Sequence, residues 1–454
     1  MKQLLACVLL VALRLQLGVA IEPENRWDTE PAGFVNEQIR FWNHGQGDVI
    51  DISEIAYSEL GTFAGVPRVH CFTKDLRAEH RYDIAILGAP LDTVSCLPNR
   101  KQAEMRSELT LLMLTGGRPG ARYGPSGIRT GSRRKAWGYS VFNGRDPLRD
   151  WAKVVDCGDA PMTFLDNRAA IKTLDQAHRS ASSRPAANPE KSSVPRIITL
   201  GGDHTTTLSA LRGTHANWGP VSVIHFDSHI GTQTTSAPHA NAGSKPCTDS
   251  YVMRGKTLGT LKPESWKTDV ELQQLMTKIF QPYLQVAVSR TMRISSYPPT
   301  HCLNLILNSS IHAGIRAPLV RRKGDMRNDV RCGFETITSR EMDKSGAQGI
   351  INKIRERVQD TKVYITVDID VLDPAFAPAT GTPEAGGWST RELLAVIEGL
   401  EGLQVVGADV VEVSPPFDNH GETTALAAAE IVHALLDLMV VTPVKAPKDN
   451  TQEL

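Results

Sequence analysis

Seven runs of apolar residues recur along the chain, and each ends in small or acidic residues. Within a run, Val, Ile and Leu follow one another almost without polar interruption. This pattern is typical of strands that are buried on both faces of a parallel sheet. The runs occupy 83–90, 154–159, 196–204, 221–229, 310–316, 363–374 and 405–416.

Segments with helical periodicity lie between these runs. They include 164–183, 340–359, 389–401 and 423–440. Strands that alternate with helices indicate an α/β domain. We therefore expect a three-layer α/β/α fold around a mostly parallel central sheet.

The first twenty residues, MKQLLACVLLVALRLQLGVA, have a different pattern. Lys2 precedes an apolar run, and the small residues Gly18-Val19-Ala20 close the segment. This order resembles a secretory signal peptide, so we expect residues 1–20 to be removed and the protein to be secreted. The alternative is a buried N-terminal helix. The run is too short to cross a bilayer, and no later segment is expected to be apolar enough to do so.

Composition divides the rest of the chain into three parts. Residues 21–80 are polar and mixed, and we expect an N-terminal extension with short helices. The apolar runs and helices then fill a single domain over 81–442. The remaining residues, 443–454, are expected to form a flexible tail.

The charge balance and the cysteine spacing limit the partners, disulfides and zinc sites that we expect. The 454 residues include 50 basic and 50 acidic side chains, so the formal net charge is zero. Without a net field to hold polyanions, we expect neither nucleic acid nor a membrane surface as a partner. Seven cysteines are present, and the six that follow the signal segment are widely spaced. Their spacing is neither a small-domain disulfide framework nor a zinc pattern, so we predict no essential disulfide.

Histidine and aspartate residues lie where several of the apolar runs end. Open parallel sheets bind ligands at the carboxyl ends of their strands, so these residues are expected to share one edge. They are His204, Asp227, His229, Asp368 and Asp370.

Asp368 and Asp370 are two residues apart and would face the same side of a strand. Two buried carboxylates side by side are unfavourable unless a cation neutralises them. The alternative is that they cap a following turn or helix. Together with Asp227 and the two histidines, however, they provide three carboxylates and two imidazoles. That set of ligands suits manganese or a similar divalent ion.

The same residues carry a family resemblance. The stretches GGDHTTT, HFDSH, VDIDVLDPAFAPATGTPEAGG and GADVVEVSPPFD resemble the signature motifs of the ureohydrolases, the family of arginase and agmatinase. RPGARYGPSGIR at 118–129 and the FDSHI form of the second motif are closer to agmatinase. The resemblance covers most of 80–230 and 307–440. It implies an α/β/α ureohydrolase domain with two Mn²⁺ ions, which cleaves a guanidinium group to urea and an amine.

The resemblance also implies a role for each residue. His204 would bind one manganese ion, and His229 and Asp370 would hold the other. Asp227 and Asp368 would bridge the two ions and are the candidate catalytic residues. Glu384, in GTPEAGG, would bind the substrate guanidinium, although outside this motif it would read as a solvated loop residue.

The implied substrate is a small guanidino compound, with agmatine, cleaved to putrescine and urea, as the first expectation. Arginase or guanidinobutyrase activity is the alternative within the family. The family also implies a homo-oligomer.

Two departures from the family pattern qualify this reading. The family continues its second motif to a further acid two positions after the histidine, and Gly231 stands there instead. A catalytically impaired homologue that lacks one metal ligand is therefore a further alternative. In addition, segments 97–115 and 231–306 interrupt the resemblance abruptly. A long insertion without structure of its own is improbable inside a compact domain. Our hypothesis is that both are translated intron or out-of-frame sequence, which transcript sequencing across them would test.

Overall fold

The structure is a computed structural model, and its described part leaves out several segments. The expected signal peptide, the atypical segments 97–115 and 231–306, and Gly231 lie outside it. The residues that the structure describes are 38–40, 49–51, 61–72, 80–92, 118–163, 166–230, 309–319, 325–327, 329 and 333–445.

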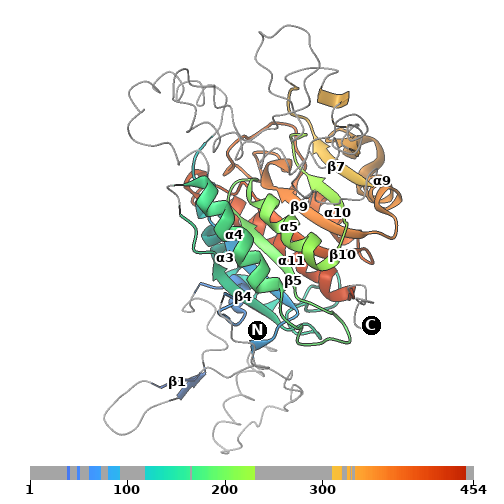
Figure 1. The fold of residues 1–454 in the computed structure, drawn as a ribbon. Helices are drawn as coiled ribbons and strands as arrows, with labels where there is room; N and C mark the ends of the chain where they lie inside the picture. The colour runs from blue at the N-terminus through green and yellow to red at the C-terminus, as the bar shows by residue number, and fades with distance from the viewer. Residues whose placement is uncertain are drawn as a thin grey trace, which may run out of the picture.

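An eight-stranded sheet forms the centre of the protein (Figure 1). Its strand order is β4-β3-β5-β10-β9-β6-β7-β8, and every neighbouring pair is parallel. The strands are β3 (Ile84–Ala89), β4 (Val154–Asp159), β5 (Arg196–Gly201), β6 (Ser222–Phe226), β7 (Ser310–Ile315), β8 (Phe334–Thr338), β9 (Lys362–Asp368) and β10 (Gln404–Val411). The parallel α/β fold expected from the sequence is confirmed.

Strand β8 was not predicted from the sequence. This strand lies at one edge of the sheet, and of its residues Phe334–Thr338 only Phe334 and Ile337 are buried. An edge strand that is covered less completely has no need of a continuous apolar run. The other seven strands were predicted from continuous apolar runs, and β8 contains no such run.

Helices cover both faces of the sheet (Figure 1). One layer contains α4 (Asn167–Ser182) and α5 (Thr206–Trp218), which pack against each other. The opposite layer contains α3 (Gly124–Gly131), α9 (Glu341–Val358), α10 (Thr390–Glu398) and α11 (Thr423–Val441). Short 3₁₀ helices are η1 (Phe63–Gly65), η5 (Ala121–Tyr123), η6 (Ser132–Trp137), η7 (Ile369–Val371) and η8 (Pro415–Phe417). The helices α3 and α5 were not named in the sequence analysis.

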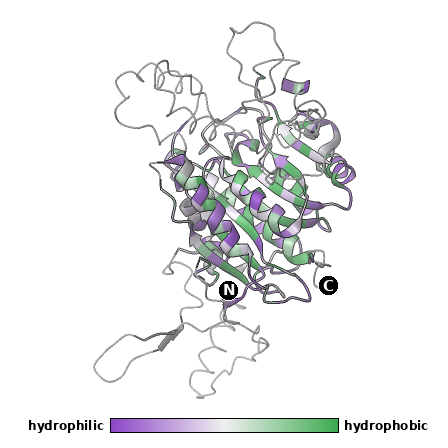
Figure 2. Ribbon diagram, viewed as in Figure 1, coloured by the Kyte–Doolittle hydropathy of each residue, from purple (hydrophilic) through white to green (hydrophobic). Residues whose placement is uncertain are grey.

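The alternation of side chains along a strand explains why the apolar runs are continuous. In β3, Ile84 and Ile86 belong to the core cluster that includes α11, whereas Ala85 and Leu87 pack in the cluster beneath α4. Successive residues point to opposite faces, and here both faces are covered. Figure 2 shows the apolar strands between helices whose polar residues face outward.

Helix α11 corrects one expectation. Its residues Thr423–Val441 reach a mean hydropathy of 1.8 over an 18-residue window, so by length and composition this helix could cross a membrane. The expectation that no later segment is this apolar was wrong. In the fold, 83% of the window is buried. The apolar character follows from packing, since α11 packs on the sheet and against its neighbours in the same layer, α3 and α10.

The two ends of the described chain also differ from expectation. In the N-terminal extension, for which short helices were expected, β1 (Gln38–Arg40) pairs antiparallel with β2 (Val49–Asp51). Near the other end, Val444 was placed in the flexible tail, but it is 3% exposed and joins the core cluster beneath α5. Residues 446–454 of the expected tail lie outside the described residues.

A disulfide joins Cys71 and Cys157, which are 86 residues apart in the sequence. This disulfide was not expected, because we predicted no essential disulfide from the cysteine spacing. The segment before Cys71 runs alongside β4, because Arg68 forms a parallel bridge with Asp156 and the Val69 amide donates to the Asp156 carbonyl at 3.0 Å. This strand-like contact brings the two Cα atoms to 5.3 Å, within the usual range for a disulfide.

Candidate metal centre

Four neighbouring strands bring polar side chains to one edge of the sheet. The strands β5, β10, β9 and β6 are consecutive in the sheet and parallel, so their carboxyl ends lie side by side. The residues at or just after these ends are His204 after β5, Glu412 after β10, Asp368 and Asp370 at β9, and Asp227 and His229 after β6.

The five residues predicted to bind metal lie together. Asp227 reaches two imidazoles at once: its Oδ2 is 3.3 Å from Nδ1 of His204, and its Oδ1 is 3.3 Å from Nδ1 of His229. A second carboxylate faces each of the two imidazoles: Asp368 Oδ2 is 3.2 Å from His204 Nδ1, and Asp370 Oδ2 is 3.0 Å from His229 Nδ1. All five side chains are at most 13% exposed.

Local backbone geometry holds the carboxylates in this arrangement. Asp368 caps the helix η7, because its Oδ1 accepts from the Asp370 amide at 2.9 Å. Its other oxygen is the one that faces His204. The cap considered as an alternative for these acids therefore exists, and it leaves one oxygen directed into the site. Two further amides fix the neighbours: Ser228 donates to Asp370 Oδ1 at 3.0 Å, and His229 donates to Asp227 Oδ1 at 2.6 Å.

The electrostatic interactions within the cluster favour a bound cation. Burial opposes a charge on His204, but hydrogen bonds and charges from Asp227 and Asp368 outweigh it and raise the pKa of this imidazole well above its usual value. His229 behaves in the same way, with burial outweighed by Asp370 and Asp227. Burial, together with the charges of Asp370 and Asp227, raises the pKa of Asp368 well above its usual value. A divalent ion would replace the imidazole protons and relieve the repulsion between these carboxylates.

The ligand atoms are also spaced for metal binding. Two groups bring a possible ligand atom from each of three residues within 4.8 Å of one another: His204, His225 and Asp227, and Asp227, His229 and Asp370. The closest N···O separations in them are 3.0 to 3.3 Å. Ligand atoms at right angles around one ion, each about 2.1 Å from it, lie about 3 Å apart. His204 with Asp227 and Asp368, and His229 with Asp227 and Asp370, have the spacing that would hold two divalent ions.

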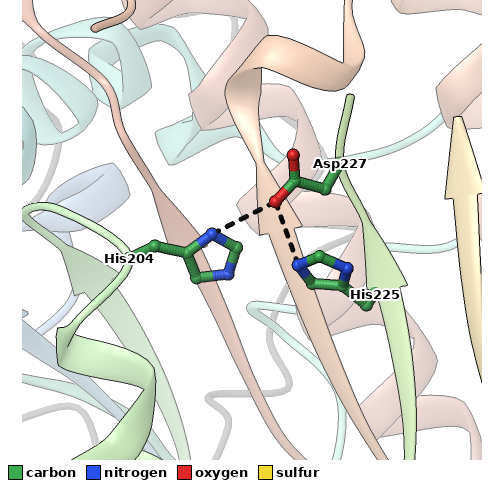
Figure 3. A group of neighbouring side chains, drawn as sticks. All are labelled: His204, His225 and Asp227. Carbon is green, nitrogen blue, oxygen red and sulfur yellow. Dashed lines mark ion pairs between the residues drawn. The ribbon is translucent and has the colours of Figure 1, made fainter. Parts of the chain in front are cut away.

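Sequence reasoning missed His225. Figure 3 shows Asp227 between His204 and His225, and the His225 Nε2 atom lies 3.0 Å from Asp227 Oδ2. Burial lowers the pKa of His225 to about 4, against the opposing effect of Asp227. The signal was available in HFDSH, since residues two apart on a strand share a face.

Sequence reasoning also missed Glu412. Its Oε1 accepts from the His204 amide at 2.8 Å, and a Cβ placed on Gly381 would lie 3.4 Å from its Oε2. Burial and the charges of Asp368 and Asp203 raise the pKa of Glu412 well above its usual value. Its φ of 62° is unusual for a residue with a side chain, and such strained positions are often found at functional sites. Like the other acids of the site, Glu412 directly follows an apolar run.

Glu384, the predicted guanidinium-binding residue, lies beside the cluster. Its Oε1 is 3.8 Å from His229 Nε2, and its side chain is 33% exposed. Arg316 holds its backbone, because the guanidinium donates to the Glu384 carbonyl from Nη2 at 2.7 Å. Glu384 and Glu412 thus present a partly exposed and a more enclosed carboxylate to the same site.

Comparison with known proteins identifies the family. The sequence model of the Arginase family matches residues 82–437. This chain belongs to the arginase family. A Schizosaccharomyces pombe relative named "Putative agmatinase 1" is 39% identical over 408 residues, which cover 88% of this chain and 86% of the relative. Agmatinase from Citrobacter koseri is 31% identical over 324 residues, covering 71% and 83%. The family and the agmatinase-like class of enzyme that the motifs implied are confirmed.

Solved structures agree with this membership. Proclavaminate amidino hydrolase from Streptomyces clavuligerus superposes with a TM-score of 0.56 at 27% identity, covering 85% of this chain and 99% of its own. A hypothetical agmatinase from Burkholderia thailandensis also has a TM-score of 0.56, at 26% identity, with coverages of 85% and 92%. The arginase-like fold expected from the sequence is therefore confirmed as well.

Proposed function

We propose that this protein hydrolyses the guanidinium group of agmatine to give urea and putrescine, with two Mn²⁺ ions as cofactor. The observation that carries the proposal is the position of Asp227, one oxygen of which faces His204 and the other His229. Asp368 and Asp370 complete the two halves. The relatives named agmatinase support the choice of substrate.

The site supplies what this reaction requires. A guanidinium carbon is a poor electrophile because its charge is delocalised. The chemistry that divalent ions provide when bound is to lower the pKa of water toward neutrality. A planar guanidinium pairs well with a carboxylate, and Glu384 and Glu412 both offer one beside the cluster. Burial of the carboxylates strengthens their interaction with a cationic substrate.

A substrate panel tests the proposal. The full chain, loaded with Mn²⁺, would be assayed for urea release from agmatine, arginine and guanidinobutyrate, and its metal content would be measured. Two ions per chain with the highest kcat/KM on agmatine support the proposal. A preference for arginine or guanidinobutyrate would move the assignment to one of those activities within the family.

Gly231 favours one second candidate, an impaired homologue. A glycine has no side chain to bind metal, so the ion beside His204 would lack one ligand of the family pattern. Wild-type protein with one ion or none and no turnover supports this candidate. The variant Gly231→Asp should then raise both metal content and urea release if the missing acid is the cause. If neither rises, the altered segment that follows is responsible.

We also propose that the protein is exported and self-associates. The N-terminal segment supports export, and the disulfide between Cys71 and Cys157 suits an oxidising compartment. N-terminal sequencing of protein secreted by its native host would find cleavage after Ala20, whereas an intact Met1 would contradict export. The family resemblance is the basis for a homo-oligomer, and light scattering at working concentration would test it.

A further inference from the structure

A row of polar residues crosses the apolar sheet directly beneath the metal-binding edge. Register partners on six adjacent strands form the row, so their side chains occupy equivalent positions. The members are Thr199 in β5, Asp409 in β10, Thr366 in β9, His225 in β6, His312 in β7 and Thr336 in β8. Five of these are at most 1% exposed, so each polar group needs a partner inside the protein.

On the β6 side of this row, two imidazoles and two carboxylates form one continuous chain. Asp227 Oδ2 lies 3.0 Å from His225 Nε2, and His225 Nδ1 lies 2.7 Å from His312 Nδ1. His312 Nε2 then lies 2.8 Å from Asp329 Oδ1, and Thr336 donates to Asp329 Oδ2 at 2.9 Å. The chain runs from the bridging carboxylate into the part of the sheet formed by β7 and β8.

The contacts define the roles of the ring nitrogens. Asp227 is an acceptor, so a neutral His225 must carry its proton on Nε2. Its Nδ1 then accepts, and His312 is the donor in the contact between the two Nδ1 atoms. A proton between His312 Nε2 and Asp329 completes the series. Asp329 thereby sets the orientation of His312, which in turn sets the tautomer of His225.

Packing prevents the chain from rearranging. Both imidazoles are fully buried, and so is Asp329. The His312 ring stacks on Phe334 with a centroid separation of 4.0 Å and an interplanar angle of 9°. The His229 amide already fixes the other oxygen of Asp227. The Asp227 carboxylate is thus held at both oxygens, by the His229 amide at Oδ1 and by His225 Nε2 at Oδ2, and these contacts orient the plane that turns one oxygen toward each imidazole of the site.

We propose that His225, His312 and Asp329 form a positioning chain that orients Asp227 for metal binding. The inference rests on the proposed metal-dependent function. None of the three residues needs to touch the substrate. Partners behind a metal ligand typically affect metal affinity by about 10- to 100-fold when they are removed, because they hold the ligand in its binding geometry.

The variant Asp329→Leu tests the chain at its far end. It removes the carboxylate while keeping the same number of side-chain heavy atoms, whereas the amide of Asp329→Asn can donate to an unprotonated Nε2 of His312 and so keep Nδ1 of His312 as the donor to His225. We expect Asp329→Leu to weaken Mn²⁺ binding about 10- to 100-fold in a chelator competition and to lower kcat more than it raises KM. Asp329→Asn should restore both to within about threefold of wild type if positioning is the cause.

Ser222→Ala is the matched control. Ser222 is fully buried at the opposite end of β6, where its hydroxyl lies 2.6 Å from that of Ser309. The Ser222→Ala variant should be less stable than wild type but should bind Mn²⁺ with the same affinity. Should Asp329→Leu not fold, His312→Phe replaces it, since a phenyl ring can retain the stack on Phe334 while losing both hydrogen bonds.

Each outcome decides between the proposals. Folded Asp329→Leu or His312→Phe protein that binds Mn²⁺ as tightly as wild type overturns the positioning chain and leaves the proposed function intact. Wild-type protein that binds no Mn²⁺ overturns both. A crystal structure of the Mn²⁺-loaded protein with His225 Nε2 bonded to an ion would show that His225 is a ligand instead, which also contradicts the positioning chain.

Discussion

Arg316 offers a sharp test of how the site is held together. Its Nη2 donates to the carbonyl oxygens of Asp370, Leu372 and Glu384 at 2.6, 3.1 and 2.7 Å, and its Nη1 donates to that of Val371 at 3.1 Å. One guanidinium thus ties the turn after β9 to the loop of Glu384. The perturbation is Arg316→Lys, which keeps the charge and removes the planar fork.

The structure sets the size of the effect. A lysine side chain is shorter than an arginine side chain, so its ammonium does not reach the position of Nη2 that contacts both segments, and it has no second nitrogen to replace Nη1; at least two of these bonds are lost. Hydrogen bonds from a charged donor contribute about 1.5 to 3 kcal/mol each, which gives a loss of roughly 3 to 6 kcal/mol. The loss reaches Asp370 and Glu384 through their own backbones. A displacement of about 1 Å at a reacting site can lower the rate about 100-fold.

The assay combines denaturant unfolding with urea release from agmatine. Arg196→Lys is the control, because Arg196 is fully buried and also donates to carbonyl groups, those of Val405 and Met439, at the opposite end of the sheet. Both variants should lose stability, whereas only Arg316→Lys should lose kcat/KM in the folded protein. Equal kcat/KM in the two variants, or wild-type activity in Arg316→Lys, would refute the reasoning.

Three other predictions follow from single sites. Asp368→Asn should lower the Mn²⁺ content below two ions per chain, which metal analysis would measure. The metal-free variant should be at least as stable as metal-free wild type when unfolded in the presence of a chelator, because burial and neighbouring charges already raise the pKa of this carboxyl. Burial lowers the pKa of His178 to about 4, so the unfolded state takes up a proton near pH 6.5 before the folded state does. The unfolding free energy should therefore fall by about 3 kcal/mol as the pH drops from 6.5 to 4, and His178→Gln should remove this part of the acid sensitivity; parallel slopes in the two proteins would contradict it. Cys71→Ser should lower the free energy of unfolding by up to about 4.6 kcal/mol, since the disulfide closes a loop of 86 residues, and a Cm unchanged by reduction of the wild type would argue against it.

Much of the candidate site could be predicted from local pattern. Each apolar run that ends in an acid or a histidine marks a buried strand and the edge at which it ends, and the five predicted ligands all followed this rule. Glu412 obeyed it too and was overlooked. His225 shares a strand face with Asp227. Both Glu412 and His225 could therefore have been predicted from the sequence.

Other features carry no local signal. His312 and Asp329 matter because β7 lies beside β6, and Arg316 matters because two distant loops pass within reach of its guanidinium. Cys71 and Cys157 meet only because the segment before Cys71 runs along β4. Contacts of this kind depend on strand order, which hydrophobic periodicity does not specify.

The amino-acid sequence by itself determined the class of fold and the chemistry gathered at one edge of the sheet, because strand burial and residue type are read from neighbouring positions. Only the tertiary structure decided which residues orient those ligands. The strand order β5-β10-β9-β6-β7-β8 aligns one polar residue from each strand beneath the site. The physical reason is that a hydrogen bond needs its partners about 3 Å apart, and only the packed sheet brings such distant residues that close.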